Sequence, residues 1–121
     1  TYGGNPLGCA VAEAVFDLVS APSTLANVTA RSEQLRAGLL ALGEKYGVFT
    51  EVRGLGLLMG AELSEKYAGR ARDVVTASLN HGLLVLNAGF DVMRFAPPLL
   101  ISESELTEGL ARFEQSLKTL V

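Results

Sequence analysis

The chain has 121 residues, of which 49% are hydrophobic and 19% are charged, and its formal net charge is −3. This composition predicts one globular domain with a single core. It excludes a nucleic-acid-binding surface, which needs a basic face, and a transmembrane segment, because every apolar run is too short. The single cysteine, Cys9, cannot form an internal disulfide, which favours a cytoplasmic protein.

Apolar periodicity predicts two helices before Gly47. Asn5 followed by Pro6 is typical of a helix start, with a capping side chain and then proline in the first turn. Apolar residues then recur at helical spacing and form one stripe, which we expect to be exposed and to cause self-association. Pro22 ends this helix. A second helix begins from the signal at residues 23–24 and ends at Gly47, a left-handed C-cap.

The pattern then alternates, which is typical of strands. Residues 48–52 form one predicted strand and residues 57–63 a second, largely buried one. The glycines of the segment Arg53–Gly56 between them suit a tight turn or bulge, and so we expect a structural role for Arg53.

The rest of the chain predicts two more helices and two more short strands. A third helix covers residues 71–79, and strands at residues 83–86 and 92–95 are joined by a hairpin-like loop. Ser102 and Glu105 form a capping box before the last helix. The resulting order, ααββαββα, predicts an α+β two-layer sandwich whose sheet is covered mainly on one side.

Arg94 is the most informative single residue, because it interrupts an otherwise apolar strand that ends at two prolines. A guanidinium in apolar surroundings is costly unless an anion meets it, and its planar fork suits a carboxylate. Arg94 is therefore a candidate for binding the carboxylate of a small acidic substrate. The alternative is a strand arginine that points to water or pairs with Asp91 or Glu62.

Other chemically active residues point to structural roles. His81 lies at a predicted helix end, and Cys9 lies near an apolar helix face, where we expect it to be buried. The acidic residues of the last helix are expected to be solvated, and no group of cysteines and histidines has the spacing of a metal site.

Three ordered motifs resemble the C-terminal part of the class III, pyridoxal-phosphate-dependent aminotransferases. They are Thr-Tyr-Gly-Gly-Asn-Pro-Leu-Gly at residues 1–8, Val-Arg-Gly-Leu-Gly-Leu-Leu-Met-Gly at 52–60, and Val-Leu-Asn-Ala-Gly with Val-Met-Arg-Phe-Ala-Pro-Pro-Leu at 85–99. Residues 67–73 and 86–89 favour the acetylornithine and succinylornithine aminotransferases within that class. The resemblance covers essentially the whole chain, and it implies the small C-terminal domain of the fold-type I enzymes.

The resemblance implies roles for two residues. Thr1 matches a threonine that binds the cofactor phosphate of the neighbouring subunit of a homodimer. Arg94 matches the arginine that receives the substrate's α-carboxylate. The resemblance also implies that the lysine that forms the Schiff base with pyridoxal 5'-phosphate precedes Thr1. Lys45, Lys66 and Lys118 lie in polar settings, and none of them matches the position of that lysine.

The resemblance also implies a domain organisation and a reaction. Residues 1–121 would be the small domain, with residues 1–22 leading in from the junction with a large cofactor-binding domain. The enzyme would move the terminal amino group of N-acetylornithine or succinylornithine to 2-oxoglutarate, giving glutamate, and we expect the chain alone to be inactive. The alternatives are another ω-amino-acid donor, ornithine or 4-aminobutyrate, and a non-catalytic binding or dimerisation module of the same fold.

Overall fold

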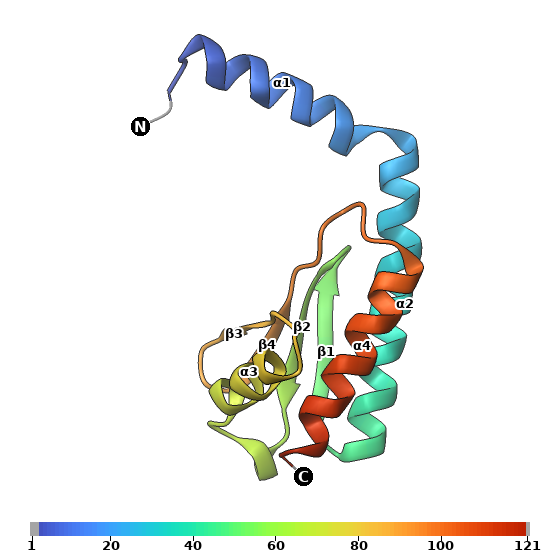
Figure 1. Cartoon of the computed structure of the whole chain (residues 1–121), viewed down its shortest axis with the longest axis vertical. Coiled ribbons are helices and arrows are strands. Elements are labelled where there is room, and N and C mark those ends of the chain that lie inside the picture. The colour runs from blue at the N-terminus through green and yellow to red at the C-terminus, as the bar shows by residue number, and fades with distance from the viewer. Residues whose placement is uncertain (1–2, 121) are drawn as a thin grey trace.

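The computed structural model describes residues 3–120, which form helices and one four-stranded sheet in the predicted order (Figure 1). A short 3₁₀ helix, η1, is the only addition among these residues. In chain order the elements are α1 (Pro6–Ser20), α2 (Pro22–Tyr46), β1 (Phe49–Leu55), β2 (Leu58–Leu63), η1 (Glu65–Tyr67), α3 (Ala71–Asn80), β3 (Leu86–Ala88), β4 (Val92–Phe95) and α4 (Glu103–Lys118).

Local signals set most helix ends as predicted. The Asn5 side chain accepts a hydrogen bond from the backbone N–H of Gly8, and Gly47 closes α2 at a φ of 63°. The capping box of α4 is complete, with Ser102 and Glu105 each bonding the other's backbone N–H. The start of α2 differs from the prediction: Pro22 begins the helix, and the Thr24 hydroxyl instead donates to the carbonyl of Leu18 in α1.

The sheet is antiparallel throughout, with strand order β1-β2-β4-β3. The turn or bulge expected at Arg53–Gly56 is displaced, because Arg53 and Gly54 continue β1 and pair with β2, and only Gly56 belongs to the turn. Leu55 lies opposite Leu58, so the turn is residues 56–57. Gly54 has a φ of 146°, and a Cβ there would collide with the carbonyl of Leu58, so this glycine permits the close approach of the two strands.

Strand β3 begins three residues later than the predicted strand at residues 83–86. Leu83 is still engaged with the end of α3, since its N–H donates to the carbonyl of Ser78. The chain becomes free to pair with β4 only at Leu86, which lies opposite Arg94.

The core lies between the sheet and the helices α2, α3 and α4, as the two-layer prediction expected. Phe113 of α4 is at its centre, edge-on to Phe95 of β4 and stacked with Phe49 of β1. The Arg36 guanidinium of α2 donates to the carbonyls of Val52 and Gly54 in the edge strand β1.

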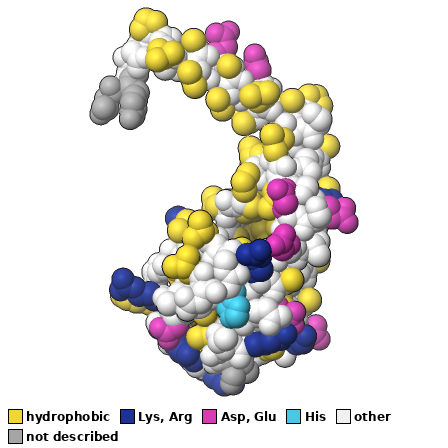
Figure 2. All heavy atoms as spheres, in the orientation of Figure 1, with side chains coloured by type: hydrophobic (Ala, Val, Ile, Leu, Met, Phe, Trp, Pro, Cys, Tyr) yellow, Lys and Arg dark blue, Asp and Glu magenta, His cyan; other side chains and the backbone are white. Residues whose placement is uncertain are grey.

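Helix α1 extends away from this body, and none of its residues is buried (Figure 1). Hydrophobic side chains therefore lie exposed along its length (Figure 2). This confirms the expected exposure of the stripe, but Cys9 is exposed rather than buried, because α1 packs only at its end against α2.

Within residues 3–120, no single helix is long and apolar enough to cross a membrane. Helices α1 and α2 reach that length and composition only when they are taken together across a bend of 59°.

Candidate functional site

Strand β4 presents its residues alternately to the core and to the opposite, open face of the sheet. Met93 and Phe95 are buried beneath the helices, whereas Val92 and Arg94 belong to the other face. The open face holds no buried residue in the described part of the chain. Its members are Glu51, Arg53, Leu55, Leu58, Gly60, Glu62, Leu86, Ala88, Val92 and Arg94.

Arg94 is exposed on this open face, which corrects the expectation of apolar surroundings. Its guanidinium has no hydrogen-bond or ion-pair partner within residues 3–120. The two partners considered from the sequence are both engaged elsewhere: Glu62 binds Arg53, and the carboxylate of Asp91 accepts the N–H of Gly69. The N–H donors of the Arg94 guanidinium are therefore available to bind an anion that is not part of the described residues.

Arg53 lies across the same face and is paired through its Nη1. Its Nη1 is 2.6 Å from Glu51 Oε2 and 2.6 Å from Glu62 Oε2. The hydrogen bond to Glu62, followed by that to Glu51, raises the pKa of the Arg53 guanidinium. This cluster was not predicted, because Arg53 was expected in a turn. The charged residues at alternate positions 51 and 53 were the available signal.

A pocket of about 470 Å³ opens beside the end of β4. Residues 83–86, residues 94–98 and the first turns of α4 line it, and most of these residues are apolar. Arg94 and Glu105 are the charged residues among its lining. This pocket has no direct signal in the sequence, because it forms only where separated segments meet, including Leu35 of α2.

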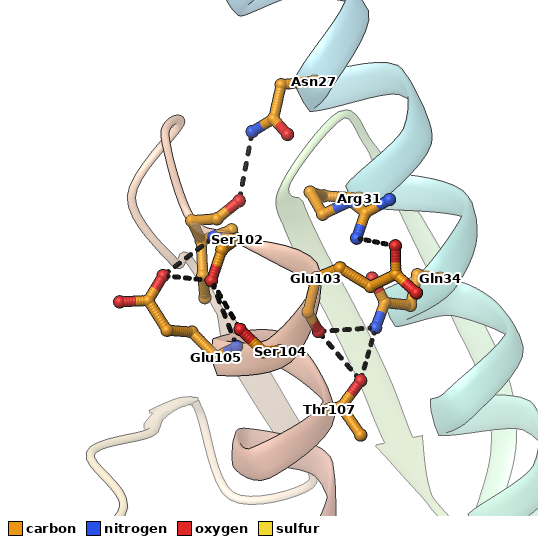
Figure 3. Close-up of polar contacts among 9 residues, drawn as sticks. Asn27, Arg31, Gln34, Ser102, Glu103, Ser104, Glu105 and Thr107 are labelled. Atoms are coloured by element: carbon orange, nitrogen blue, oxygen red, sulfur yellow. Dashed lines mark hydrogen bonds and ion pairs between the residues drawn. The ribbon is translucent and has the colours of Figure 1, made fainter.

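Polar contacts between α2 and the start of α4 hold the segment that follows Arg94 (Figure 3). The Asn27 amide donates to the carbonyls of Leu99 and Ile101 at 2.9 and 3.1 Å. Next to it, Arg31 lies 3.2 Å from the Glu103 carboxylate. The segment that follows β4 is thus fixed to α2. Arg94 itself lies on a strand that pairs with β2 on one side and β3 on the other, and so it is held on a rigid element.

Gln34 and the capping box complete these contacts (Figure 3). The Gln34 amide donates to the Glu103 carbonyl and to the Thr107 hydroxyl. Hydrogen bonds from the Ser102 hydroxyl and backbone lower the pKa of Glu105, which stays ionised at the rim of the pocket.

Thr1, the candidate phosphate-binding residue, lies outside the described residues. Gly3 and Gly4, which follow it, have open space around them and precede the N-terminus of α1. This start of α1 is well separated from β4, so the described residues do not bring the two candidate regions together (Figure 1).

The three lysines are exposed, at Lys45, Lys66 and Lys118. Lys45 Nζ donates to Glu114 Oε1 at 2.6 Å, and this contact raises its pKa. His81 caps the end of α3, as predicted. Residues 3–120 contain no group of three or more His, Cys, Asp or Glu side chains arranged to bind a metal.

Comparisons with known proteins point in one direction. The profile of the family described as aminotransferase class-III matches residues 1–117. The acetylornithine aminotransferase of Vibrio parahaemolyticus is 54% identical over 121 residues, covering 100% of this chain and 30% of the relative. The crystal structure of N-acetylornithine aminotransferase from Stenotrophomonas maltophilia superimposes with a TM-score of 0.94 at 42% identity, over 98% of this chain and 32% of that one. Ornithine aminotransferase from Toxoplasma gondii gives a TM-score of 0.86 at 31% identity, over 98% and 28%.

Proposed function

Because the chain belongs to the class-III aminotransferase family, we propose that it is the C-terminal small domain of a pyridoxal-phosphate-dependent aminotransferase. The chain spans about a third of the length of the relatives it matches, so the activity concerns the whole protein that carries it. In that protein, residues 1–22 lead in from a large domain. The projection of α1 from the body supports this arrangement (Figure 1).

The proposed reaction moves the terminal amino group of N-acetylornithine or succinylornithine to 2-oxoglutarate. Arg94 carries the proposal, because it is an unpaired guanidinium on a rigid strand beside a pocket. Its two parallel N–H groups would hold the α-carboxylate of donor and acceptor in turn. This contact fixes one end of each substrate and so sets the position of its reacting end.

Pyridoxal phosphate, when bound, supplies the carrier for the amino group. The residues near Thr1 fit its phosphate: Gly3 and Gly4 leave room for an anion, and the helix that follows presents its N-terminus. We assign Thr1 to that phosphate, in the neighbouring subunit of a homodimer. The lysine that holds the cofactor lies outside this chain in our proposal. That lysine needs a lowered pKa, whereas Lys45 has a raised one and Lys66 and Lys118 are exposed.

The donor could instead be another ω-amino acid, and the similarity to an ornithine aminotransferase keeps that alternative open. A binding or dimerisation module without catalysis is the alternative from another class. Single turnovers of the whole protein with N-acetylornithine, ornithine and 4-aminobutyrate separate these possibilities. A protein that transfers no amino group from any of them would favour the module.

The central test is Arg94→Ala in the whole protein. In the proposed whole enzyme, the bound substrate would bury its ion pair with Arg94. Truncating one partner of a buried charge pair costs about 2–5 kcal/mol, so kcat/KM should fall roughly 30-fold to a few thousand-fold for both half-reactions. Arg94→Lys should recover only part, because it keeps the charge and loses the fork. Cofactor absorbance should stay normal.

Arg72→Ala is the matched control, since Arg72 is an exposed arginine of α3 remote from the open face. It should leave both half-reactions unchanged. If Arg94→Ala stays within about threefold of wild type, a free-energy change below about 0.7 kcal/mol, Arg94 does not bind the substrate carboxylate.

A further inference from the structure

Glu62 is the carboxylate best placed to compete for Arg94. Arg94 of β4 lies opposite Gly60 of β2, and Glu62 lies opposite Val92, so Glu62 and Arg94 are diagonal neighbours on the same open face. Diagonal neighbours in a sheet have backbones about 7–8 Å apart, which long charged side chains span easily. Gly60 has no side chain to separate them. Left alone, the two side chains would form a cross-strand ion pair.

Arg53 prevents this pairing in the structure. Its Nη1 holds Glu62 Oε2 at 2.6 Å, from the strand on the far side of β2 relative to Arg94. The same nitrogen holds Glu51 Oε2 at 2.6 Å. Glu62 is thus drawn toward β1, and Arg94 has no partner within the described residues.

The other carboxylates near Arg94 are also occupied. Glu105, which shares the pocket lining with Arg94, is held by the hydroxyl and backbone of Ser102. Asp91, three residues before Arg94 in the chain, accepts the N–H of Gly69. Among these three carboxylates, Asp91 and Glu105 each accept a backbone N–H, whereas Glu62 is held by one side chain, that of Arg53.

We propose that Arg53 is a positioning residue, which holds Glu62 away from Arg94 and so keeps the Arg94 guanidinium free for a substrate carboxylate. The inference rests on the proposed function of Arg94. Without Arg53, Glu62 would occupy the fork in the free protein, and each incoming carboxylate would first have to displace it. This competition lowers apparent affinity and leaves the bound complex unchanged.

The test is Arg53→Gln in the whole protein. An exposed ion pair that forms in the free state should raise KM for 2-oxoglutarate about two- to sixfold and leave kcat unchanged. The inhibition constant of glutarate, a dicarboxylate that accepts no amino group, should rise by the same factor. Arg53→Lys should give a smaller rise, because it offers a point charge in place of a fork.

Two double variants separate direct pairing from a general change of charge. Arg53→Gln with Glu62→Gln should restore KM, because the competitor is gone. Arg53→Gln with Glu51→Gln removes the same charge but should not restore it, since Glu51 lies on β1 and β2 separates it from β4. Glu62→Gln alone should leave KM within about 1.5-fold of wild type.

The inference fails if Arg53→Gln leaves KM unchanged, or if both double variants restore it equally, or if neither does. If Arg53→Gln does not fold, Glu62→Gln and Glu51→Gln are each combined with Arg53→Lys instead. The inference then fails if both of these double variants restore KM equally or if neither does. These results are distinct from failure of the proposed function, which appears as an Arg94→Ala variant with normal kinetics.

Discussion

Replacing Phe113 by alanine tests how the core supports the strand that carries Arg94. Phe113 is 1% exposed. Its ring is 5.1 Å from that of Phe95 at an interplanar angle of 86°, and 6.2 Å from that of Phe49 at 2°. Phe95 is the residue after Arg94, on the other face of β4. The variant therefore removes the packing directly beneath the candidate site.

The expected loss is large compared with the stability of the domain. A buried Phe→Ala change costs about 3–5 kcal/mol, and each well-oriented aromatic pair contributes about 0.5–1.5 kcal/mol beyond its buried area. Phe113 makes two such pairs, which places the expected loss near about 4–5 kcal/mol, at the upper end of that range. A domain of 121 residues has a total stability of about 6–18 kcal/mol.

Urea denaturation of the 121-residue chain measures this loss, provided that fluorescence and circular dichroism give coincident transitions. Phe16→Ala is the matched control, because Phe16 in α1 is 67% exposed. It should change the unfolding free energy by less than about 0.5 kcal/mol. A loss below about 1 kcal/mol for Phe113→Ala, or equal losses for both variants, would refute the assigned core.

Two further predictions concern pH and association. Hydrogen bonds from Lys45 and then Tyr46 lower the pKa of Glu114. The ionised Glu114 therefore stabilises the fold at pH values above its unfolded-state pKa of about 4.3, and this stabilisation is lost as the pH falls through its lower folded-state pKa. Glu114→Gln should remove this acid-side step from urea titrations at a series of pH values, and an unchanged step would assign it to other groups. The exposed stripe of α1 should make the 121-residue chain associate with increasing concentration in light scattering, and Val15→Lys with Phe16→Lys should abolish this. A wild-type chain that stays monomeric at high concentration would contradict it.

The helix ends could be predicted because their signals are local. Asn5, Gly47 and the box of Ser102 and Glu105 act through contacts within a few residues, and each was found where the sequence placed it. The strand limits could not be predicted equally well. Arg53 and Gly54 are typical of a turn by composition, but pairing with β2 keeps them in the strand.

The candidate site could be predicted only where its signal was local. Arg94 stood out as a charge in an apolar strand, although its exposure depends on which face the sheet leaves uncovered. The contacts of Arg53 with Glu51 and Glu62 depend on register across two strands, which no single segment specifies. Cys9 was misplaced because it was treated as a small buried hydrophobe, whereas no residue of α1 is buried.

The Arg36 guanidinium also limits how this chain can aggregate. It covers the carbonyls of Val52 and Gly54 on the outer side of β1, where an incoming strand would have to bind. The opposite edge of the sheet, β3, is only three residues long. Neither edge offers a long row of free backbone groups to a second molecule. Amyloid-type growth by adding strands at the edges of the sheet is therefore disfavoured on both sides.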